Sequence, residues 1–250
     1  MCKNNYFKSL TIVAAMIFAA MTGHTQQMET SVYVNGIFPV AQFNNAVELM
    51  PVGEFVPMDR TNVATGASAG LAATARFGMW FNVGFGQLMP YAEASFMWNS
   101  TKGSLRDVYD QNEYNVEVKA TPTTPTYFNV PILLGLKYRY DVTPIIRPFV
   151  EAGIGYDVLF ITGNGYRNSP VIDNQMWYTY RPSGNLCWSV GAGTYLGEYV
   201  SAGLYYMGLG NHRIEYRKGV DAVTNPESPD NFIAQKRRLG EIGIRVGFHF

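Results

Sequence analysis

Charged side chains are scarce in this sequence, and their scarcity excludes several classes of function. Asp, Glu, Lys and Arg make up 15% of the 250 residues, whereas a soluble domain carries about a quarter. The formal net charge is zero and no long basic run interrupts the chain. We therefore expect no binding of nucleic acid.

Cysteine and histidine are also rare. The two cysteines are Cys2 and Cys187, and no intramolecular disulfide can form if Cys2 is removed with a signal peptide. Outside that segment the histidines are His212 and His249. With a single cysteine they give none of the usual metal-ligand spacings, so we expect neither a metal nor a cofactor.

Long apolar runs are missing after residue 25, which excludes a membrane-spanning helix of about twenty residues. The chain begins MCKNNYFKSLTIVAAMIFAAMTGHTQQ, where Lys3 and Lys8 precede an apolar run over residues 10–21. Small and polar residues follow. This is the layout of a secretory signal peptide, which we place at residues 1–25. The mature chain, 26–250, is therefore exported.

Strict alternation of apolar and polar residues is the main pattern in the mature chain. In YFNVPILLGLKYRYD, residues 127–141, one face of an extended strand would be wholly apolar. The segments 145–160 and 242–250 repeat this pattern. Weaker versions occur at 30–38, 67–81, 87–99, 185–196 and 199–209. The sequence thus predicts about eight strands of roughly ten residues, the number and length used by outer-membrane barrels.

The connections between these strands alternate in length. Long polar stretches at 39–62, 100–125, 163–184 and 211–235 separate strand pairs joined by short links at 82–86, 141–144 and 197–199. Outer-membrane barrels have long outer loops and short periplasmic turns. We therefore expect an all-β fold consisting of a single closed antiparallel transmembrane β-barrel, 26–250, with both termini in the periplasm.

The alternative is a soluble, lipocalin-like barrel with its apolar face turned inward. Such a barrel would cover its outward face with Lys, Glu, Thr and Ser. Here the second face is rich in glycine, at positions 135, 153, 155, 191, 193, 203, 243 and 247. Small residues suit a crowded interior, so we assign the apolar face to lipid.

Charges of both signs share this second face. They are Arg76, Glu93, Lys137, Arg139, Arg147, Glu151, Asp157, Glu241 and Arg245. Buried charges are tolerated when they are paired and hydrogen-bonded, and eight strands leave an interior just wide enough for side chains. The sequence therefore predicts a lumen charge network that plugs the barrel and leaves no wide pore.

Aromatic residues gather at the ends of the predicted strands. Tyr127 and Phe128 lie at one end of their strand, and Tyr138 and Tyr140 lie at the other, as in interfacial girdles. The terminal strand ends on an aromatic residue. Its lipid-facing series, which we expect to close against the first strand, is Ile242, Ile244, Val246, Phe248 and Phe250.

The segments FNVPILLGLKYRY and RPFVEAGIGYDVLF, joined by a short turn, resemble the paired central strands of an outer-membrane barrel-domain family. This family is common in the Gram-negative Bacteroidetes and includes the barrel component of the gliding-associated secretion system. It is similar to the small eight-stranded barrels of the outer-membrane protein A type. The resemblance implies that the barrel-assembly machinery reads the terminal strand, but it implies fold rather than activity.

Motifs that could carry catalysis have plainer interpretations. GASAG at 66–70 matches the G-x-S-x-G nucleophile elbow around Ser68, but the following LAATARFGMWF is strand-like, so we expect a strand start. We interpret His212 as a solvated loop histidine and His249 as a residue filling the lumen mouth. We interpret Cys187 as a buried free thiol.

The long loops carry the candidates for recognition. Trp177, Tyr178 and Tyr180 stand among polar residues in the stretch 164–185, a mixture found in recognition surfaces; alternatively, these rings rest on the barrel rim. The cationic stretch NHRIEYRKG at 211–219 could contact lipopolysaccharide.

The sequence therefore predicts a non-enzymatic outer-membrane barrel with a plugged lumen and with surface loops for interaction or envelope structure. The expected partners are outer-membrane lipid, lipopolysaccharide, the assembly machinery and other envelope proteins. Two alternatives stay open: a barrel subunit of a secretion or transport complex, and a narrow channel for small solutes. An enzyme that modifies outer-leaflet lipid through Ser68 or His212 is the least favoured alternative.

Overall fold

The computed structural model describes residues 27–45, 47–48, 64–101, 108–111, 117–120, 123–143, 145–165, 177–218 and 233–250. The predicted signal peptide, 1–25, lies outside these residues. Within the described ranges, no helix is long and apolar enough to cross a membrane.

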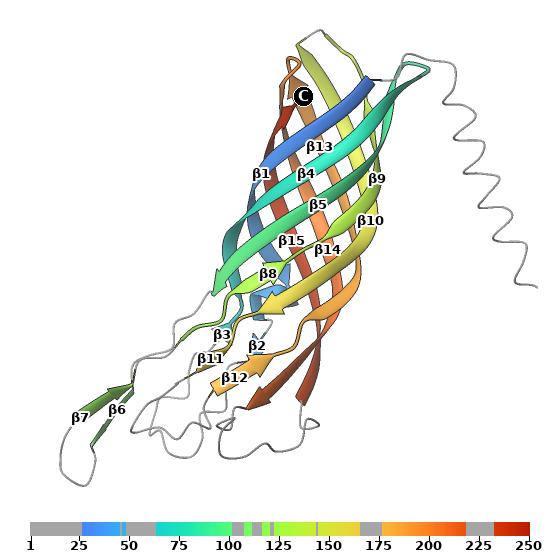
Figure 1. Cartoon of the computed structure of the whole chain (residues 1–250). Helices are drawn as coiled ribbons and strands as arrows, with labels where there is room; N and C mark the ends of the chain where they lie inside the picture. The colour runs from blue at the N-terminus through green and yellow to red at the C-terminus, as the bar shows by residue number, and fades with distance from the viewer. Residues whose placement is uncertain are drawn as a thin grey trace, which may run out of the picture.

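A closed antiparallel β-barrel forms the body of the protein (Figure 1). Its wall consists of β1 (Gln27–Ala41), β4 (Ala67–Val83), β5 (Gly86–Thr101), β8 (Tyr127–Asn129) continued by β9 (Ile132–Arg139), β10 (Ile146–Ile161), β13 (Ser183–Leu196), β14 (Val200–Lys218) and β15 (Ile233–His249). Each strand pairs with the next, and β15 pairs with β1 from Ser31↔His249 to Ala41↔Leu239. The predicted fold, an eight-strand barrel closed by the terminal strand, is confirmed.

The small elements gather at the end of the barrel opposite the C-terminus (Figure 1). They are η1 (Gln42–Asn45), the pair β2 (Val47–Glu48) and β3 (Ala64–Thr65), the pair β6 (Val108–Gln111) and β7 (Glu117–Ala120), and β11 (Asn164–Gly165) with β12 (Trp177–Tyr180). The short turns lie at the end that holds the C-terminus. We call these the long-loop end and the short-turn end.

Proline explains the interruption between β8 and β9. Pro131 has no backbone N–H to give to a neighbouring strand. Its carbonyl still accepts from the N–H of Ser95 at 3.0 Å, and Val130 donates to the carbonyl of Val158 at 3.0 Å. The chain therefore continues through this point as one segment of the wall.

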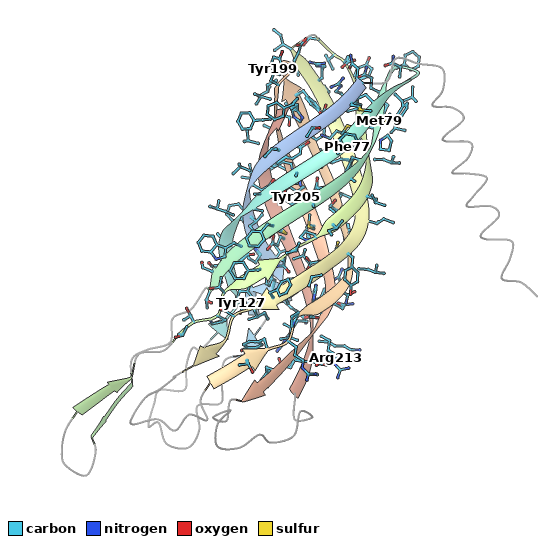
Figure 2. The ribbon with its side chains drawn as sticks, in the orientation of Figure 1. Phe77, Met79, Tyr127, Tyr199, Tyr205 and Arg213 are labelled. Carbon is cyan, nitrogen blue, oxygen red and sulfur yellow. The ribbon has the colours of Figure 1, made fainter. Side chains whose placement is uncertain are left out.

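Large apolar side chains cover the outward face of the barrel (Figure 2). Leu134, Ile154 and Leu186 are 66%, 73% and 74% exposed, although a protein in water buries such residues. The terminal series from Ile242 to Phe250 is also exposed. The alternation assigned the outward side chains correctly on each of these strands.

Aromatic rings mark both ends of this apolar surface, with one correction. Near the long-loop end, Trp98, Phe128 and Phe160 lie side by side on neighbouring strands. Near the short-turn end, Tyr138, Tyr140, Tyr199, Phe248 and Phe250 are exposed. The assignment of Tyr127 to the girdle was wrong, because the alternation turns its ring inward, where it is fully buried against Phe43 with ring centroids 5.6 Å apart.

A β-bulge in β14 changes which side chains face the lumen. The pairing with β15 shifts between Gly208 and Gly210, which leaves Leu209 as an extra residue, and Gly210 has a φ of +95°. An extra residue reverses the alternation beyond it. The predicted loop 211–235 therefore begins and ends as strand, and His212 points inward and is fully buried, which corrects its interpretation as a solvated loop residue.

Candidate functional site

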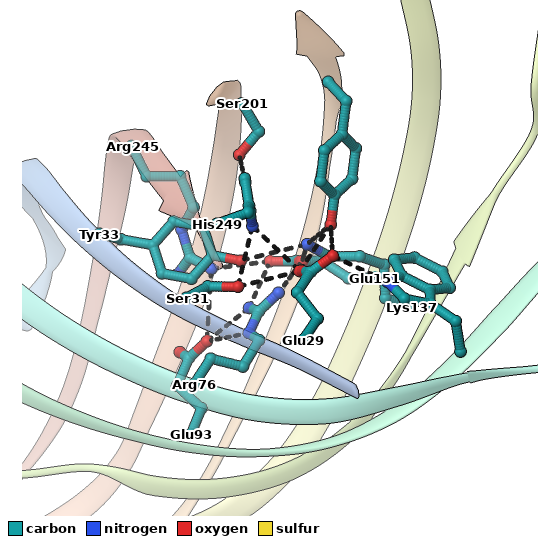
Figure 3. A network of polar contacts seen from close by, with 12 residues as sticks. Glu29, Ser31, Tyr33, Arg76, Glu93, Lys137, Glu151, Ser201, Arg245 and His249 are labelled. Atoms are coloured by element: carbon teal, nitrogen blue, oxygen red, sulfur yellow. Dashed lines mark hydrogen bonds and ion pairs between the residues drawn. The ribbon is translucent and has the colours of Figure 1, made fainter. Parts of the chain in front are cut away.

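Five charged side chains from five strands meet in the middle of the lumen (Figure 3). They are Arg76 of β4, Glu93 of β5, Lys137 of β9, Glu151 of β10 and Arg245 of β15. All are at most 8% exposed. We call these five residues the central network.

The two carboxylates of the central network each bind more than one cation. Arg76 donates from Nε to Glu93 Oε2 at 2.8 Å and from Nη1 to Glu151 Oε2 at 2.7 Å. Arg245 Nη1 donates to Glu151 Oε1 at 2.8 Å and approaches Glu93 Oε2 at 3.5 Å. Lys137 Nζ lies 3.5 Å from Glu151 Oε2. Glu151 therefore contacts all three cations, which makes it the centre of the network.

Aromatic rings enclose the three cations. The guanidinium carbons of Arg76 and Arg245 lie 4.0 Å and 4.1 Å from the ring centroids of Tyr91 and Tyr205. Lys137 Nζ lies 4.3 Å from the ring centroid of Phe149. Such cation–π contacts are stronger where water is excluded.

Glycines make room for two of these rings. A Cβ atom at Gly135 would lie 2.4 Å from the ring of Tyr91, and one at Gly243 would lie 2.2 Å from the ring of Tyr205. Neither distance is compatible with a side chain at the glycine. The sequence predicted that small residues suit a crowded interior. At these two positions, the lack of a Cβ atom lets a tyrosine ring reach an arginine.

A second polar layer lies beside the central network, toward the short-turn end. Glu29 accepts from Ser31 Oγ at 2.9 Å, Trp80 Nε1 at 2.7 Å and Tyr195 Oη at 2.9 Å, and it contacts His249 Nδ1 at 3.0 Å. Lys137 Nζ donates to Tyr195 Oη at 3.2 Å, which links the two layers. Three cations in the central network face two carboxylates, and Glu29 supplies the third negative charge.

Sequence reasoning missed Glu29 because the first strand was predicted at 30–38, whereas β1 begins at Gln27. The signal was available, since Glu29 has the same parity as the inward residues Ser31 and Tyr33. His249 lies in the lumen near the short-turn end, where the sequence placed it, with Nε2 2.7 Å from Ser201 Oγ.

The remaining four predicted network residues lie elsewhere in the lumen. Arg139 and Arg147 lie at the mouth of the short-turn end. Asp157 and Glu241 lie in the half toward the long loops, both fully buried. Asp157 Oδ2 is 3.1 Å from His212 Nε2. The nine charges therefore separate into three groups along the barrel, where the sequence predicted a single network.

His212, Asp157 and Ser183 form a triad-like cluster in the half of the lumen toward the long loops. Ser183 Oγ is 3.3 Å from His212 Nδ1, but the carbonyl of Ser183 is closer to the same nitrogen, at 3.1 Å. The carbonyl of Leu209 lies 2.9 Å from Nε2. The two ring nitrogens therefore contact the Asp157 carboxylate, two backbone carbonyls and the Ser183 hydroxyl, and the whole cluster is buried in the lumen.

Glu241 is the least compensated charge in the lumen. Its side chain is fully buried, and among the described residues neither carboxylate oxygen has a hydrogen-bond partner by distance and angle. Asn99 is its polar neighbour, and the nearby Asp157 is another acid.

At a pH high enough to ionise Glu241, its replacement with glutamine is therefore expected to stabilise the barrel by about 1 kcal/mol or more, because a buried carboxylate without a cation costs more than a neutral amide of the same shape. Urea unfolding of the refolded protein in lipid vesicles measures this change. A Glu93→Gln variant is the matched control and should lose stability, since Glu93 binds Arg76. A loss of stability in Glu241→Gln similar to that control would contradict this interpretation.

The other residues singled out from the sequence all lie in strands: Ser68 in β4, Cys187 in β13, and Trp177, Tyr178 and Tyr180 in β12. Ser68 lies at the start of β4 with its Oγ 2.6 Å from Ser100 Oγ, so the expected strand start is confirmed. Cys187 is a buried free thiol, as expected. Trp177 and Tyr178 lie in β12, but their side chains fall outside the described part of the chain; Tyr180 packs against the apolar cluster of the lumen.

No protein-family model and no curated protein sequence matches the chain. Three similar solved structures are a major outer membrane protein from Thermus thermophilus, Neisserial surface protein A and the outer membrane enzyme PagL. Their TM-scores are 0.41, 0.40 and 0.36, with 12%, 7% and 14% sequence identity. The alignments cover 90%, 91% and 89% of this chain and 100%, 100% and 98% of the other chains. Because these TM-scores lie below 0.5, the function is inferred from the residues of this chain alone.

Proposed function

We propose that this chain is an integral outer-membrane β-barrel without enzymatic activity. Its lumen is closed by side chains, and its long loops serve interaction or envelope structure. This proposal rests on a burial pattern that is the reverse of the one found in water-soluble proteins. Charges of both signs are buried inside the barrel, while Leu, Ile, Val and aromatic side chains cover its outside.

An aqueous environment does not suit this surface. Exposed apolar area costs roughly 25 cal/mol per Å² in water, and contiguous apolar surface of this kind marks a membrane or protein contact. The bands of aromatic rings at both ends match the interfacial girdles of membrane barrels. Lipid around the barrel removes the cost, and the closure of β15 against β1 leaves the wall without a free sheet edge.

Quenching of tryptophan fluorescence by brominated lipid tests the lipid-facing assignment. Trp98 and Trp188 point outward, 50% and 41% exposed, whereas Trp80 points into the lumen and is 3% exposed. In variants that keep one tryptophan, we expect strong quenching at the two outward positions and weak quenching at Trp80. Equal quenching at all three positions would contradict the proposal.

Lipid phosphate groups are the proposed contact at the long-loop end. Beyond the apolar surface, Arg213 of β14 pairs directly with Lys236 of β15, and Arg238 follows on the same outward face. All three side chains are exposed, and Arg213 also contacts Glu215 at 2.9 Å. Figure 2 shows Arg213 at this end of the barrel. The cluster suits the anionic groups of lipopolysaccharide and supports an orientation with the long loops outside and both termini in the periplasm.

A barrel subunit of a secretion or transport complex is the second candidate function. It is motivated by the resemblance of residues 128–140 and 147–160 to the paired strands of the Bacteroidetes barrel-domain family. Purification of the tagged protein from its native membrane in mild detergent separates the two candidates. A barrel that repeatedly purifies alone counts against the complex, whereas a fixed set of envelope proteins in stoichiometric amounts would replace the first proposal.

A further inference from the structure

A cavity opens into the barrel at the short-turn end. It has a volume of about 560 Å³, and its lining includes Trp80, Arg139, Arg147, Glu198, Tyr199 and His249. Figure 2 shows Tyr199 at this mouth. The polar layer around Glu29 forms the floor of the cavity and separates it from the central network.

Contacts with Trp80 and Gln87 hold Arg139 in this cavity, and its ion pair with Asp141 is long and half exposed. Its guanidinium carbon lies 4.2 Å from the ring centroid of Trp80, and its Nη2 donates to Gln87. Its Nε lies 3.6 Å from Asp141 Oδ1, which is too far for a hydrogen bond, and this carboxylate is half exposed to solvent. Most donors of the guanidinium therefore have no hydrogen-bond acceptor among the described residues.

Arg147 adds a second cation to the same mouth. Its Nη2 donates to the carbonyl of Gly197 at 2.8 Å, and its Nε has no hydrogen-bond partner in the described ranges. The structure gives it no ion pair with a described carboxylate. Arg139 lines the same cavity, so the two cations share one mouth.

The acidic side chains that line the cavity make no ion pair with either arginine among the described residues. Glu29 is saturated by donors from serine, tryptophan, tyrosine and histidine. Glu198 forms no ion pair with Arg139 or Arg147 among the described residues. Two guanidinium groups with unused donors line one cavity that opens to solvent, and guanidinium donors of this kind recognise oxyanions.

We propose that the mouth of the short-turn end binds a single carboxylate or phosphate group between Arg139 and Arg147. The two oxyanions share the geometry that a guanidinium recognises. Trp80 and Tyr199 offer apolar area to whatever group carries the anion.

Isothermal titration calorimetry of the full refolded chain in detergent tests the proposal. The probes are inorganic phosphate, acetyl-dialanine with a free carboxylate, and the same dipeptide as its amide. We expect saturable binding of at least one anion, weakened by added salt, and no binding of the amide. Binding of phosphate alone assigns a phosphate-bearing ligand, and binding of the free acid alone assigns a peptide carboxylate.

Matched variants decide whether the two arginines are responsible. Arg147→Gln and Arg139→Gln are each expected to weaken binding about tenfold or more, the effect of one lost charge-assisted hydrogen bond. Arg181→Gln at the opposite end, where the arginine is half exposed and pairs with Glu215, is the control and should bind as the wild type does. Heat-modifiable gel migration checks that each variant is folded. Equal affinity of the Arg147→Gln variant and the wild type, equal binding of the acid and its amide, or no binding of either anion would overturn the proposal.

Discussion

Replacing Glu151 with glutamine is expected to destabilise the barrel by about 3–5 kcal/mol, the cost of removing one partner from a buried ion pair. Glu151 contacts Arg76, Lys137 and Arg245, all almost fully buried. Its loss leaves three cations facing the single carboxylate of Glu93. The size of this effect follows from the burial of these groups, which are at most 8% exposed.

Urea unfolding in lipid vesicles, followed by tryptophan fluorescence and by heat-modifiable migration, measures this change. Glu215→Gln is the matched control. Glu215 pairs with Arg181 and Arg213, whose side chains are more than half exposed, so its replacement should change stability by less than about 1 kcal/mol. A Glu151→Gln variant that is as stable as this control would show that the central network does not hold the barrel together.

Replacing Gly243 with valine is expected to block folding or to cost several kcal/mol, at or above the roughly 1–3 kcal/mol of ordinary overpacking. A Cβ atom at this position would lie 2.2 Å from the ring of Tyr205. That ring covers the guanidinium of Arg245 at 4.1 Å. The added side chain therefore displaces the ring of Tyr205, and the guanidinium of Arg245 loses its cation–π contact.

The fraction of folded protein after refolding, read from the shifted gel band, measures this effect. Gly36→Val is the control, because a Cβ atom at Gly36 meets nothing within 4 Å. A Gly243→Val, Tyr205→Ala double variant should fold better than Gly243→Val alone, since it removes the clashing ring. Normal folding of Gly243→Val would refute the packing role assigned to this glycine.

The alternation of residue types predicted the barrel because one physical rule acts along every strand. In a closed wall each residue faces either lipid or the lumen, so a period of two is imposed wherever the strand is regular. The inward positions of Arg76, Glu93, Lys137, Glu151 and Arg245 follow from this rule. Their meeting point in one layer depends on strand tilt and register, which the sequence does not show.

The sequence predictions failed where a bulge interrupts the alternation of inward and outward residues, or where the end of a strand was misplaced. The bulge at Leu209 reverses the parity of β14, so the burial of His212 could not be read from the pattern. Glu29 was missed because its strand begins earlier than predicted. The separation of Arg139 and Arg147 from the central network reflects their positions near strand ends, and strand ends are the least reliable part of such predictions.

Planar-bilayer conductance of the refolded wild-type protein tests the central claim that side chains close the lumen. Heat-modifiable migration first shows that the protein has folded as a barrel, and a bilayer that receives detergent alone gives the background. We predict no channel activity above that background, because the central network and its aromatic rings fill the middle of the barrel. Steady single-channel currents of reproducible size would contradict this account and make passage of small solutes the leading function.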